Sequence, residues 1–227
     1  MGKYTKSKSL SDSVTIQIGK VTLEGNIFVP EGSTGIVLFA HGSGSSRLSP
    51  RNHFVAEELN KNGIATLLFD LLTAEEEVLD LQTGHLRFDI QLLAKRLIDT
   101  TDWVLKNPDL KSLNIGYFGA STGGGAALVA ASERPRVVKA VVSRGGRPDL
   151  AGQSLSGVKC PTLLIVGGYD EPVIELNKKA LALLKSEKKL VIIPGATHLF
   201  EEKGKLDEVA SHACNWFLKY LTEDKKR

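Results

Sequence analysis

The chain has 227 residues, of which 42% are hydrophobic and 24% charged, the composition of an ordinary globular protein. This length fits one α/β domain with a sizeable core. The 29 basic and 26 acidic side chains give a net charge of +3, and the basic excess lies in the two ends. Because no basic stripe runs through the rest of the sequence, a nucleic-acid-binding surface is not expected.

The N-terminus shows no apolar segment of the kind found in secretory signal peptides, and no apolar run is long enough to cross a membrane. The two cysteines, Cys160 and Cys214, lie in apolar surroundings and are too few for a disulfide framework. We therefore expect a soluble cytoplasmic protein with buried, free thiols. We expect a single domain over residues 1–227, with flexible tails at 1–12 and 222–227.

Short apolar runs and amphipathic stripes alternate along most of the chain. Continuous apolar runs are typical of strands buried on both faces of a sheet, and stripes spaced by three and four residues are typical of helices. Strands that alternate with helices predict a parallel sheet covered on both faces. In chain order, the expected elements are an antiparallel hairpin (14–18 and 21–29), a strand (36–40), a helix (51–62), a strand (64–69), a helix (86–106), a strand (113–118), a helix (122–133), two strands (137–142 and 162–166), a helix (172–184), a strand (190–193) and a final helix (206–220).

The most informative motif is a serine between two glycines, at Gly119-Ala120-Ser121-Thr122-Gly123. It lies between a predicted strand and a predicted helix of small residues, the context that a G-x-S-x-G nucleophile elbow requires. The flanking glycines leave room where side chains would clash, and the turn exposes the serine hydroxyl at the start of a helix, where negative charge is favoured. Ser121 is therefore the candidate nucleophile.

A nucleophilic serine needs a histidine base, and the histidine needs a carboxylate that orients it. Asp170 and His198 each follow a predicted strand, in the chain order Ser, Asp, His that this kind of elbow uses. The carboxyl ends of parallel strands meet at one edge of the sheet, so the three side chains are expected to converge. Asp149, in the loop after the preceding strand, is the competing acid.

An oxyanion site should accompany such a nucleophile. One donor is expected to be the backbone N–H of the residue after the nucleophile, Thr122, and the second should come from the loop after an earlier strand. That loop reads His41-Gly42-Ser43-Gly44, and Ser43 is the candidate donor. The sequence has no metal-binding spacing of His and Cys and no dinucleotide fingerprint, so neither a metal nor a cofactor is expected.

At these residues the chain resembles the α/β-hydrolase superfamily and, within it, the dienelactone-hydrolase-like family. Three stretches are similar to a bacterial branch of that family that uses a serine nucleophile: residues 41–47, 69–77 and 143–149. The resemblance covers about residues 14–220 and implies an eight-stranded, mostly parallel sheet and a Ser121–Asp170–His198 triad. Dienelactone hydrolase itself uses a cysteine nucleophile, so a serine esterase is the safer inference.

The surroundings of the site limit the substrate. Fewer than twenty residues separate Val142 from Thr162, where many α/β-hydrolases carry a cap domain, so the pocket should be open and shallow. Apolar side chains that follow the strand 64–69, Leu72 among them, could form a wall beside it or pack beneath a surface loop. The members of this group are Leu71, Leu72, Val78, Leu79 and Leu81.

Three arginines lie in loops on the same side as the predicted site. Guanidinium groups bind carboxylates and phosphates with two hydrogen bonds, so Arg47, Arg144 and Arg147 are candidates for recognition of an anionic substrate group. The alternative is local ion pairing, such as Arg147 with Asp149.

These observations favour a serine hydrolase that cleaves small soluble esters or lactones through an acyl-enzyme, with no nucleic-acid or membrane partner. The same triad would also serve an acyltransferase, a thioesterase, an amide hydrolase or a perhydrolase. A third interpretation is a scaffold that keeps the fold without activity. The sequence does not indicate the oligomeric state.

Overall fold

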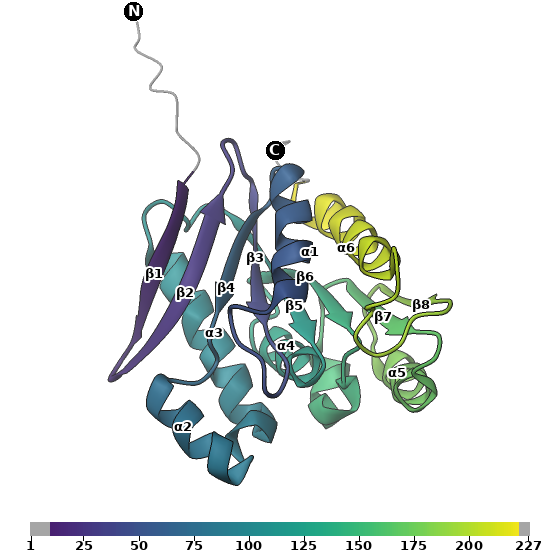
Figure 1. The fold of residues 1–227 in the computed structure, drawn as a ribbon. Helices are drawn as coiled ribbons and strands as arrows, with labels where there is room; N and C mark the ends of the chain where they lie inside the picture. Colours follow the sequence, from purple (N-terminus) through teal and green to yellow (C-terminus); the bar gives the residue numbers. More distant parts are fainter. Residues whose placement is uncertain (1–9, 223–227) are drawn as a thin grey trace, which may run out of the picture.

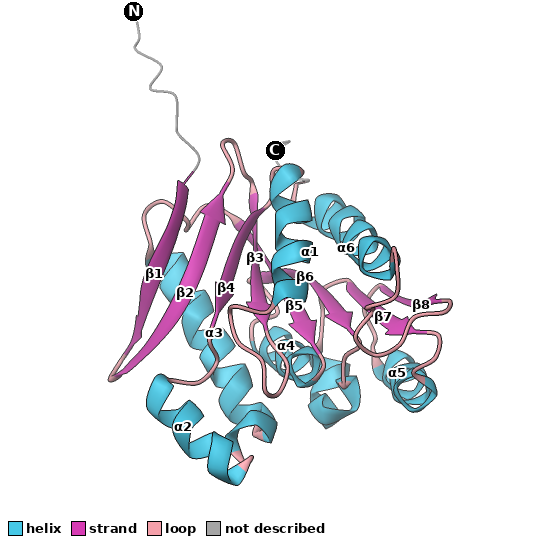
Figure 2. Ribbon diagram, viewed as in Figure 1, coloured by secondary structure: helices cyan, strands magenta, loops and turns pink. Residues whose placement is uncertain are grey.

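A twisted sheet of eight strands runs through the part of the chain that the structure, a computed structural model, describes, residues 10–222 (Figures 1 and 2). The strand order is β1-β2-β4-β3-β5-β6-β7-β8. The first two strands are antiparallel to their neighbours, and all later pairs are parallel. The strands are β1 (Leu10–Ile18), β2 (Val21–Val29), β3 (Gly35–Ala40), β4 (Ala65–Phe69), β5 (Asn114–Ala120), β6 (Val138–Arg144), β7 (Thr162–Gly167) and β8 (Lys188–Ile193).

Helices cover both faces of this sheet. Helices α1 and α6 pack together on one face, and α3, α4 and α5 lie on the other (Figure 1). A short 3-10 helix, η2, is the main element between β6 and β7, so no cap domain is inserted there. The helices are α1 (Pro50–Lys61), α2 (Ala74–Thr83), η1 (Leu86–Phe88), α3 (Ile90–Lys106), α4 (Thr122–Glu133), η2 (Pro148–Gly157), α5 (Glu171–Leu183) and α6 (Lys205–Leu221).

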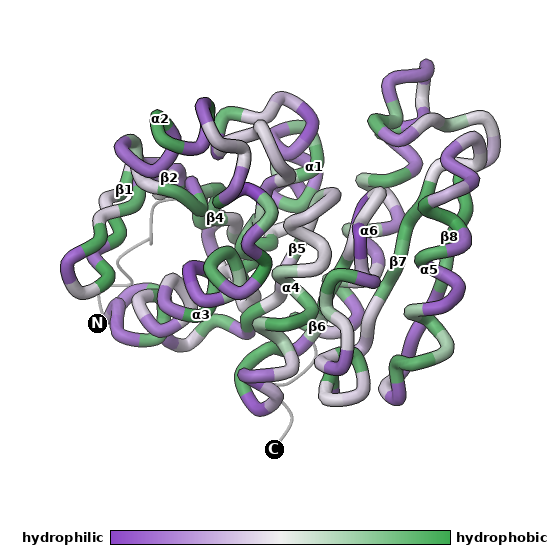
Figure 3. Tube along the Cα trace, turned by 90° about the horizontal axis from the view of Figure 1, so that it is seen from below, coloured by the Kyte–Doolittle hydropathy of each residue, from purple (hydrophilic) through white to green (hydrophobic). Residues whose placement is uncertain are grey.

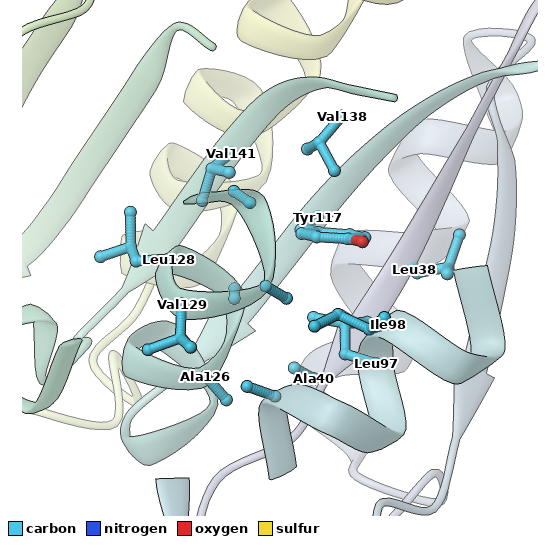
Figure 4. Close-up of a cluster of buried hydrophobic side chains, with 14 of the residues drawn as sticks. Leu38, Ala40, Leu97, Ile98, Tyr117, Ala126, Leu128, Val129, Val138 and Val141 are labelled. Carbon is cyan, nitrogen blue, oxygen red and sulfur yellow. The ribbon is translucent and has the colours of Figure 1, made fainter. Parts of the chain in front are cut away.

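Two hydrophobic clusters, one on each face, hold the layers together. The central strands are buried along their whole length, because parallel strands covered on both sides meet no solvent. Figure 3 shows hydrophobic residues along β6 and β7. Figure 4 shows Tyr117 of β5 among side chains of β3, α3 and α4. The buried Tyr117 hydroxyl forms a hydrogen bond of 2.6 Å with Thr101 Oγ1, so its polar atom is satisfied.

Most of the expected elements are confirmed, with three differences. Strand β1 begins at Leu10, so residues 10–12 belong to the sheet rather than to a tail. The remaining tail residues of that prediction, 1–9 and 223–227, lie outside the described part. The helix expected over 86–106 is divided into η1 and α3, because the Asp89 carboxylate accepts a hydrogen bond from Leu92 N and starts a new helix there.

The third difference is helix α2, which was not among the expected elements. Thr73 and Glu76 form a reciprocal capping box at its start: Glu76 N donates to Thr73 Oγ1, and Thr73 N donates to the Glu76 carboxylate. This pairing satisfies backbone donors that the first turn of a helix leaves free.

Across residues 10–222, no helix is both long and apolar enough to span a bilayer.

Candidate active site

Ser121 sits at the tip of a strained turn between β5 and α4. Its backbone has φ 49° and ψ −121°, a region that non-glycine residues rarely adopt. A Cβ atom on Gly119 would lie 2.6 Å from the Gly124 Cα, and one on Gly123 would lie 2.6 Å from the His41 carbonyl oxygen. Only glycine fits at either position, which explains the spacing of the motif. The Ser121 side chain does not cap α4, so its hydroxyl is left for another role.

Asp170 and His198 come together at the same edge of the sheet. His198 Nδ1 lies 2.6 Å from Asp170 Oδ2, and the carboxylate does not cap helix α5, which begins one residue later. Because Nδ1 is bound to Asp170, Nε2 is the ring nitrogen left for a nucleophile. The competing acid, Asp149, is instead held by two hydrogen bonds from Arg147, of 2.9 and 2.8 Å.

The main chain after β6 connects the serine to the histidine. Ser121 N donates to the Arg144 carbonyl at 3.2 Å. The next residue, Gly145, has φ 51°, and a Cβ there would lie 3.4 Å from His198 Cε1. The histidine ring therefore packs against the segment that also binds the nucleophile backbone, as the convergence of strand ends predicts.

The loop after β3 approaches Ser121 from the other side. A Cβ on Gly42 would lie 3.0 Å from Ser121 Cβ, so this loop touches the candidate nucleophile. The backbone N–H groups of Ser43 and Thr122, the two expected oxyanion donors, have no hydrogen-bond acceptor within residues 10–222. Two free donors beside a nucleophile are the parts that an oxyanion site needs.

His41 fixes the conformation of this loop. Its Nε2 accepts a hydrogen bond from Leu71 N at 3.0 Å, so Nδ1 carries the proton and donates to the Gly42 carbonyl at 3.0 Å. The ring is therefore neutral. Burial lowers the pKa of His41 below 6.5, although the Gly42 carbonyl and the Asp70 and Glu77 carboxylates act in the opposite direction.

This lowered pKa predicts a pH dependence of stability. Between the folded and unfolded pKa values the unfolded chain binds more protons, so the free energy of unfolding falls as the pH decreases below about 6.5. Urea unfolding between pH about 7.5 and about 5 should show a shallower decline for His41→Gln than for the unmodified protein. Parallel pH curves for the two proteins would show that His41 does not contribute to this dependence.

The structure assigns the three candidate anion-binding arginines to other contacts. Arg47 pairs with Asp70, and its own backbone N–H also donates to that carboxylate. Arg147 pairs with Asp149, which is the alternative stated above. Arg144 belongs to the end of β6 rather than to a loop, and its side chain is only 5% exposed. None of the three is a free guanidinium at the mouth of a pocket.

A small pocket beside Ser43 contains an arginine that the sequence did not single out. The loop of residues 41–45, which holds the candidate oxyanion donor Ser43 and is called the oxyanion loop below, lines it together with Leu72 and Arg87. Leu72 is buried and lines this pocket, whereas Val78, Leu79 and Leu81 of the same group are exposed on α2. Arg87 binds Asp80 through Nε at 2.5 Å, and its Nη1 would lie 3.7 Å from a Cβ on Gly44. No spacing rule in the sequence identifies Arg87, because its approach depends on α2 and η1.

Helix α2 forms the rim of this pocket and is attached mainly by polar contacts. Its one buried residue is Asp80, and Glu77 also lines the pocket. The Glu76 carboxylate binds Arg96 of α3 at 2.5 Å, while Asp80 binds Arg87. Val78 and Leu81 are 61% and 71% exposed. The helix therefore turns its acidic side toward the body of the protein and apolar side chains toward solvent.

The sheet with its strand–turn–helix at Ser121 defines an α/β hydrolase. Residues 23–222 match the dienelactone hydrolase family, and the chain belongs to that family. A dienelactone hydrolase structure from Anabaena variabilis is 63% identical, with a TM-score of 0.93 over 95% of this chain and 100% of that one. An α/β serine hydrolase without lid from Xanthomonas campestris is 18% identical with a TM-score of 0.73, covers 94% of this chain and 96% of its own, and shares the fold.

Two curated relatives from Mycobacterium tuberculosis, provisionally named phosphoribosyl transferases, are 59% identical over 211 residues. The match covers 92% of this chain and 46% of theirs, so the chain spans about half the length of these relatives.

Proposed function

We propose that this protein is a serine hydrolase that cleaves small soluble carboxylic esters or lactones through an acyl-enzyme on Ser121. The observation that carries the proposal is the hydrogen bond of 2.6 Å between His198 and Asp170 at the same sheet edge as a serine in a strained elbow. Membership of the dienelactone hydrolase family supports the assignment to hydrolytic chemistry. The serine distinguishes this site from a thiol-based one.

In the proposed mechanism, His198 Nε2 takes the proton of the Ser121 hydroxyl as the oxygen attacks the ester carbonyl. Asp170 keeps the imidazole in the required tautomer and stabilises the imidazolium that forms. The carbonyl oxygen becomes an oxyanion, which the N–H groups of Ser43 and Thr122 would bind. His198 then returns the proton to the leaving alcohol, and a water molecule, activated by the same histidine, hydrolyses the acyl-enzyme.

The surroundings of Ser121 favour small substrates. Between β6 and β7 the chain inserts only the short helix η2, so no cap encloses a long acyl chain. The wall beside the oxyanion loop combines an apolar side chain, Leu72, with the polar groups of Asp80 and Arg87. A short ester fits this open, mixed surface better than a long lipid. We do not propose phosphoribosyl transfer for this protein. The chain spans about half the length of the relatives with that name, and its residues 23–222 match a hydrolase family.

Hydrolysis of p-nitrophenyl esters over a series of acyl lengths tests this proposal. Activity should be highest on the shortest esters and should disappear in Ser121→Ala. A fluorophosphonate probe should label the unmodified protein at Ser121 and leave the variant unlabelled. Folded protein that neither labels nor hydrolyses any ester would instead favour the scaffold interpretation, and activity that peaks on long chains would contradict the open pocket.

The same assay tests which molecule accepts the acyl group from the acyl-enzyme. Added alcohol, thiol or hydrogen peroxide should compete poorly with water, so that free acid remains the main product. A transfer product in excess of the acid would reassign the chemistry to an acyltransferase or perhydrolase that uses the same triad, and faster turnover of thioesters than of matched esters would assign a thioesterase.

A further inference from the structure

Two non-glycine residues among residues 10–222 have a positive φ, and both lie at the candidate active site. Ser121 has φ 49°, and Phe200, two residues after His198, has φ 57°. For a bulky aromatic residue this conformation is an outlier that destabilises the fold, and it persists only where the surroundings impose it. Strained backbone conformations are concentrated at functional sites. The contacts of Phe200 therefore indicate which functional group its conformation helps to position.

Arg144 is the residue that touches both strained segments. Its carbonyl accepts the hydrogen bond from Ser121 N. Its guanidinium lies over the Phe200 ring, with 6.0 Å between Cζ and the ring centroid. A cation over an aromatic ring is attracted by the negative face of the ring, and more strongly when both groups are removed from water. The Phe200 ring is 1% exposed.

The buried position of the Arg144 side chain lowers the stability of the fold. Its only side-chain hydrogen bond among the described residues is to Asn52 Oδ1 at 3.1 Å, and its buried Nε has no partner. No described carboxylate pairs with it; burial and the nearby charge of Arg51 lower its pKa to about 10. A buried cation without a counter-ion destabilises a fold, and an apolar side chain of similar size would pack there at lower cost. Residues that lower stability in this way are retained where function requires them.

We propose that Arg144 is a positioning residue, whose guanidinium holds the Phe200 ring and thereby keeps the loop 194–204 and His198 in place beside Ser121. The residue after Arg144, Gly145, also packs closely against His198. A Cβ on Gly145 would lie 3.1 Å from the His198 carbonyl oxygen and 3.4 Å from its ring. A displaced Phe200 would therefore displace the imidazole two residues earlier. The inference rests on the proposed function for its kinetic readout.

Two further contacts hold the same loop and supply a control. The Glu202 carboxylate accepts from Thr197 N at 3.1 and 3.2 Å. Arg51 of α1 pairs with Glu201 at 3.0 Å, and Glu201 is 63% exposed. Exposed ion pairs contribute little, so Glu201→Gln removes a contact to this loop that does not itself involve Arg144 or the Phe200 ring.

The test compares Arg144→Met, Phe200→Leu, their double variant and Glu201→Gln. A displacement of about 1 Å in a catalytic group can reduce the rate by about a hundredfold, so kcat on a short ester should fall roughly 10- to 100-fold in Arg144→Met, with KM nearly unchanged. Its thermal midpoint should be equal to or above that of the unmodified protein, because an unpaired buried charge is removed. The double variant should lose no more activity than the worse single variant, and Glu201→Gln should stay within about twofold.

A spectroscopic readout separates positioning from general damage. The low-field NMR signal of the proton on His198 Nδ1 reports the hydrogen bond to Asp170, and it should shift or disappear in Arg144→Met while it stays in place in Glu201→Gln. An unchanged kcat, or an unchanged signal in folded Arg144→Met, would overturn the proposal. If Arg144→Met does not fold, Phe200→Leu decides by the same criteria. If the unmodified protein hydrolyses no ester, the proposed function fails, and the Nδ1 signal still tests the role of Arg144.

Discussion

Replacement of Ser121 by alanine is expected to reduce kcat for a short ester by roughly 10⁴- to 10⁶-fold, with KM changed little. The reason is that, in the proposed mechanism, the Ser121 hydroxyl oxygen forms the bond to the acyl group. The Ser121 side chain makes no helix cap, so its removal should leave the fold intact. Steady-state kinetics and circular dichroism on the same preparation would check both parts of this prediction.

His198→Ala provides the matched comparison. Residues that act as one unit are strongly non-additive, so the double variant Ser121→Ala/His198→Ala should be about as slow as either single variant. Losses that multiply in the double variant would show that the two side chains work independently. Full activity in His198→Ala would remove the histidine from the mechanism and reopen the assignment of the base.

Replacement of Gly123 by alanine is expected to cause a large loss of stability. Its Cβ would lie 2.6 Å from the His41 carbonyl oxygen and 2.7 Å from the Ala40 carbonyl carbon, which are rigid backbone atoms at the end of the central strand β3. Nothing there can move without shifting the oxyanion loop or the elbow. We expect a destabilisation of roughly 4 kcal/mol or more, or a protein that does not fold.

Gly157→Ala is the control for this variant. It makes the same chemical change and has the same effect on the unfolded chain, but its Cβ would meet only the Ser132 side chain, at 3.3 Å, and its φ is ordinary. Urea unfolding should place it within about 1 kcal/mol of the unmodified protein. Equal stability of the Gly123 and Gly157 variants would mean that the close approach at the elbow is wrong.

The strands and the elbow could be predicted from the sequence because the signals are local. A strand buried on both faces is a continuous apolar run, and the elbow needs glycines at fixed positions beside its serine. Asp170 and His198 could be predicted as partners of Ser121 from their order in the chain. The rule that functional groups lie at the carboxyl ends of parallel strands supported the same prediction. The structure brings these two side chains into contact, although they are 28 residues apart.

The other parts of the site depend on contacts that sequence spacing does not encode. Arg144 was expected in a loop, but β6 continues through it, and the charge lies buried beneath Phe200. Arg47 and Arg147 turned out to have acidic partners, one of them 23 residues away in the chain. Helix α2 did have a local signal, the Thr73–Glu76 capping box, but it has no buried apolar stripe, so no helix was expected there.

Helix α2 has a consequence for how proteins of this fold diverge. It borders the pocket, yet its attachment depends on two carboxylates, Glu76 and Asp80, while Val78 and Leu81 contact solvent. Substitutions on this outer side disturb no core packing and are expected to change stability by no more than about 0.5 kcal/mol. Substitutions in the sheet and the elbow are expected to lower stability much more. Helix α2, the rim of the pocket, is therefore the part that can change with little loss of stability. Changes in this single helix can therefore alter the border of the pocket while the reacting groups stay untouched.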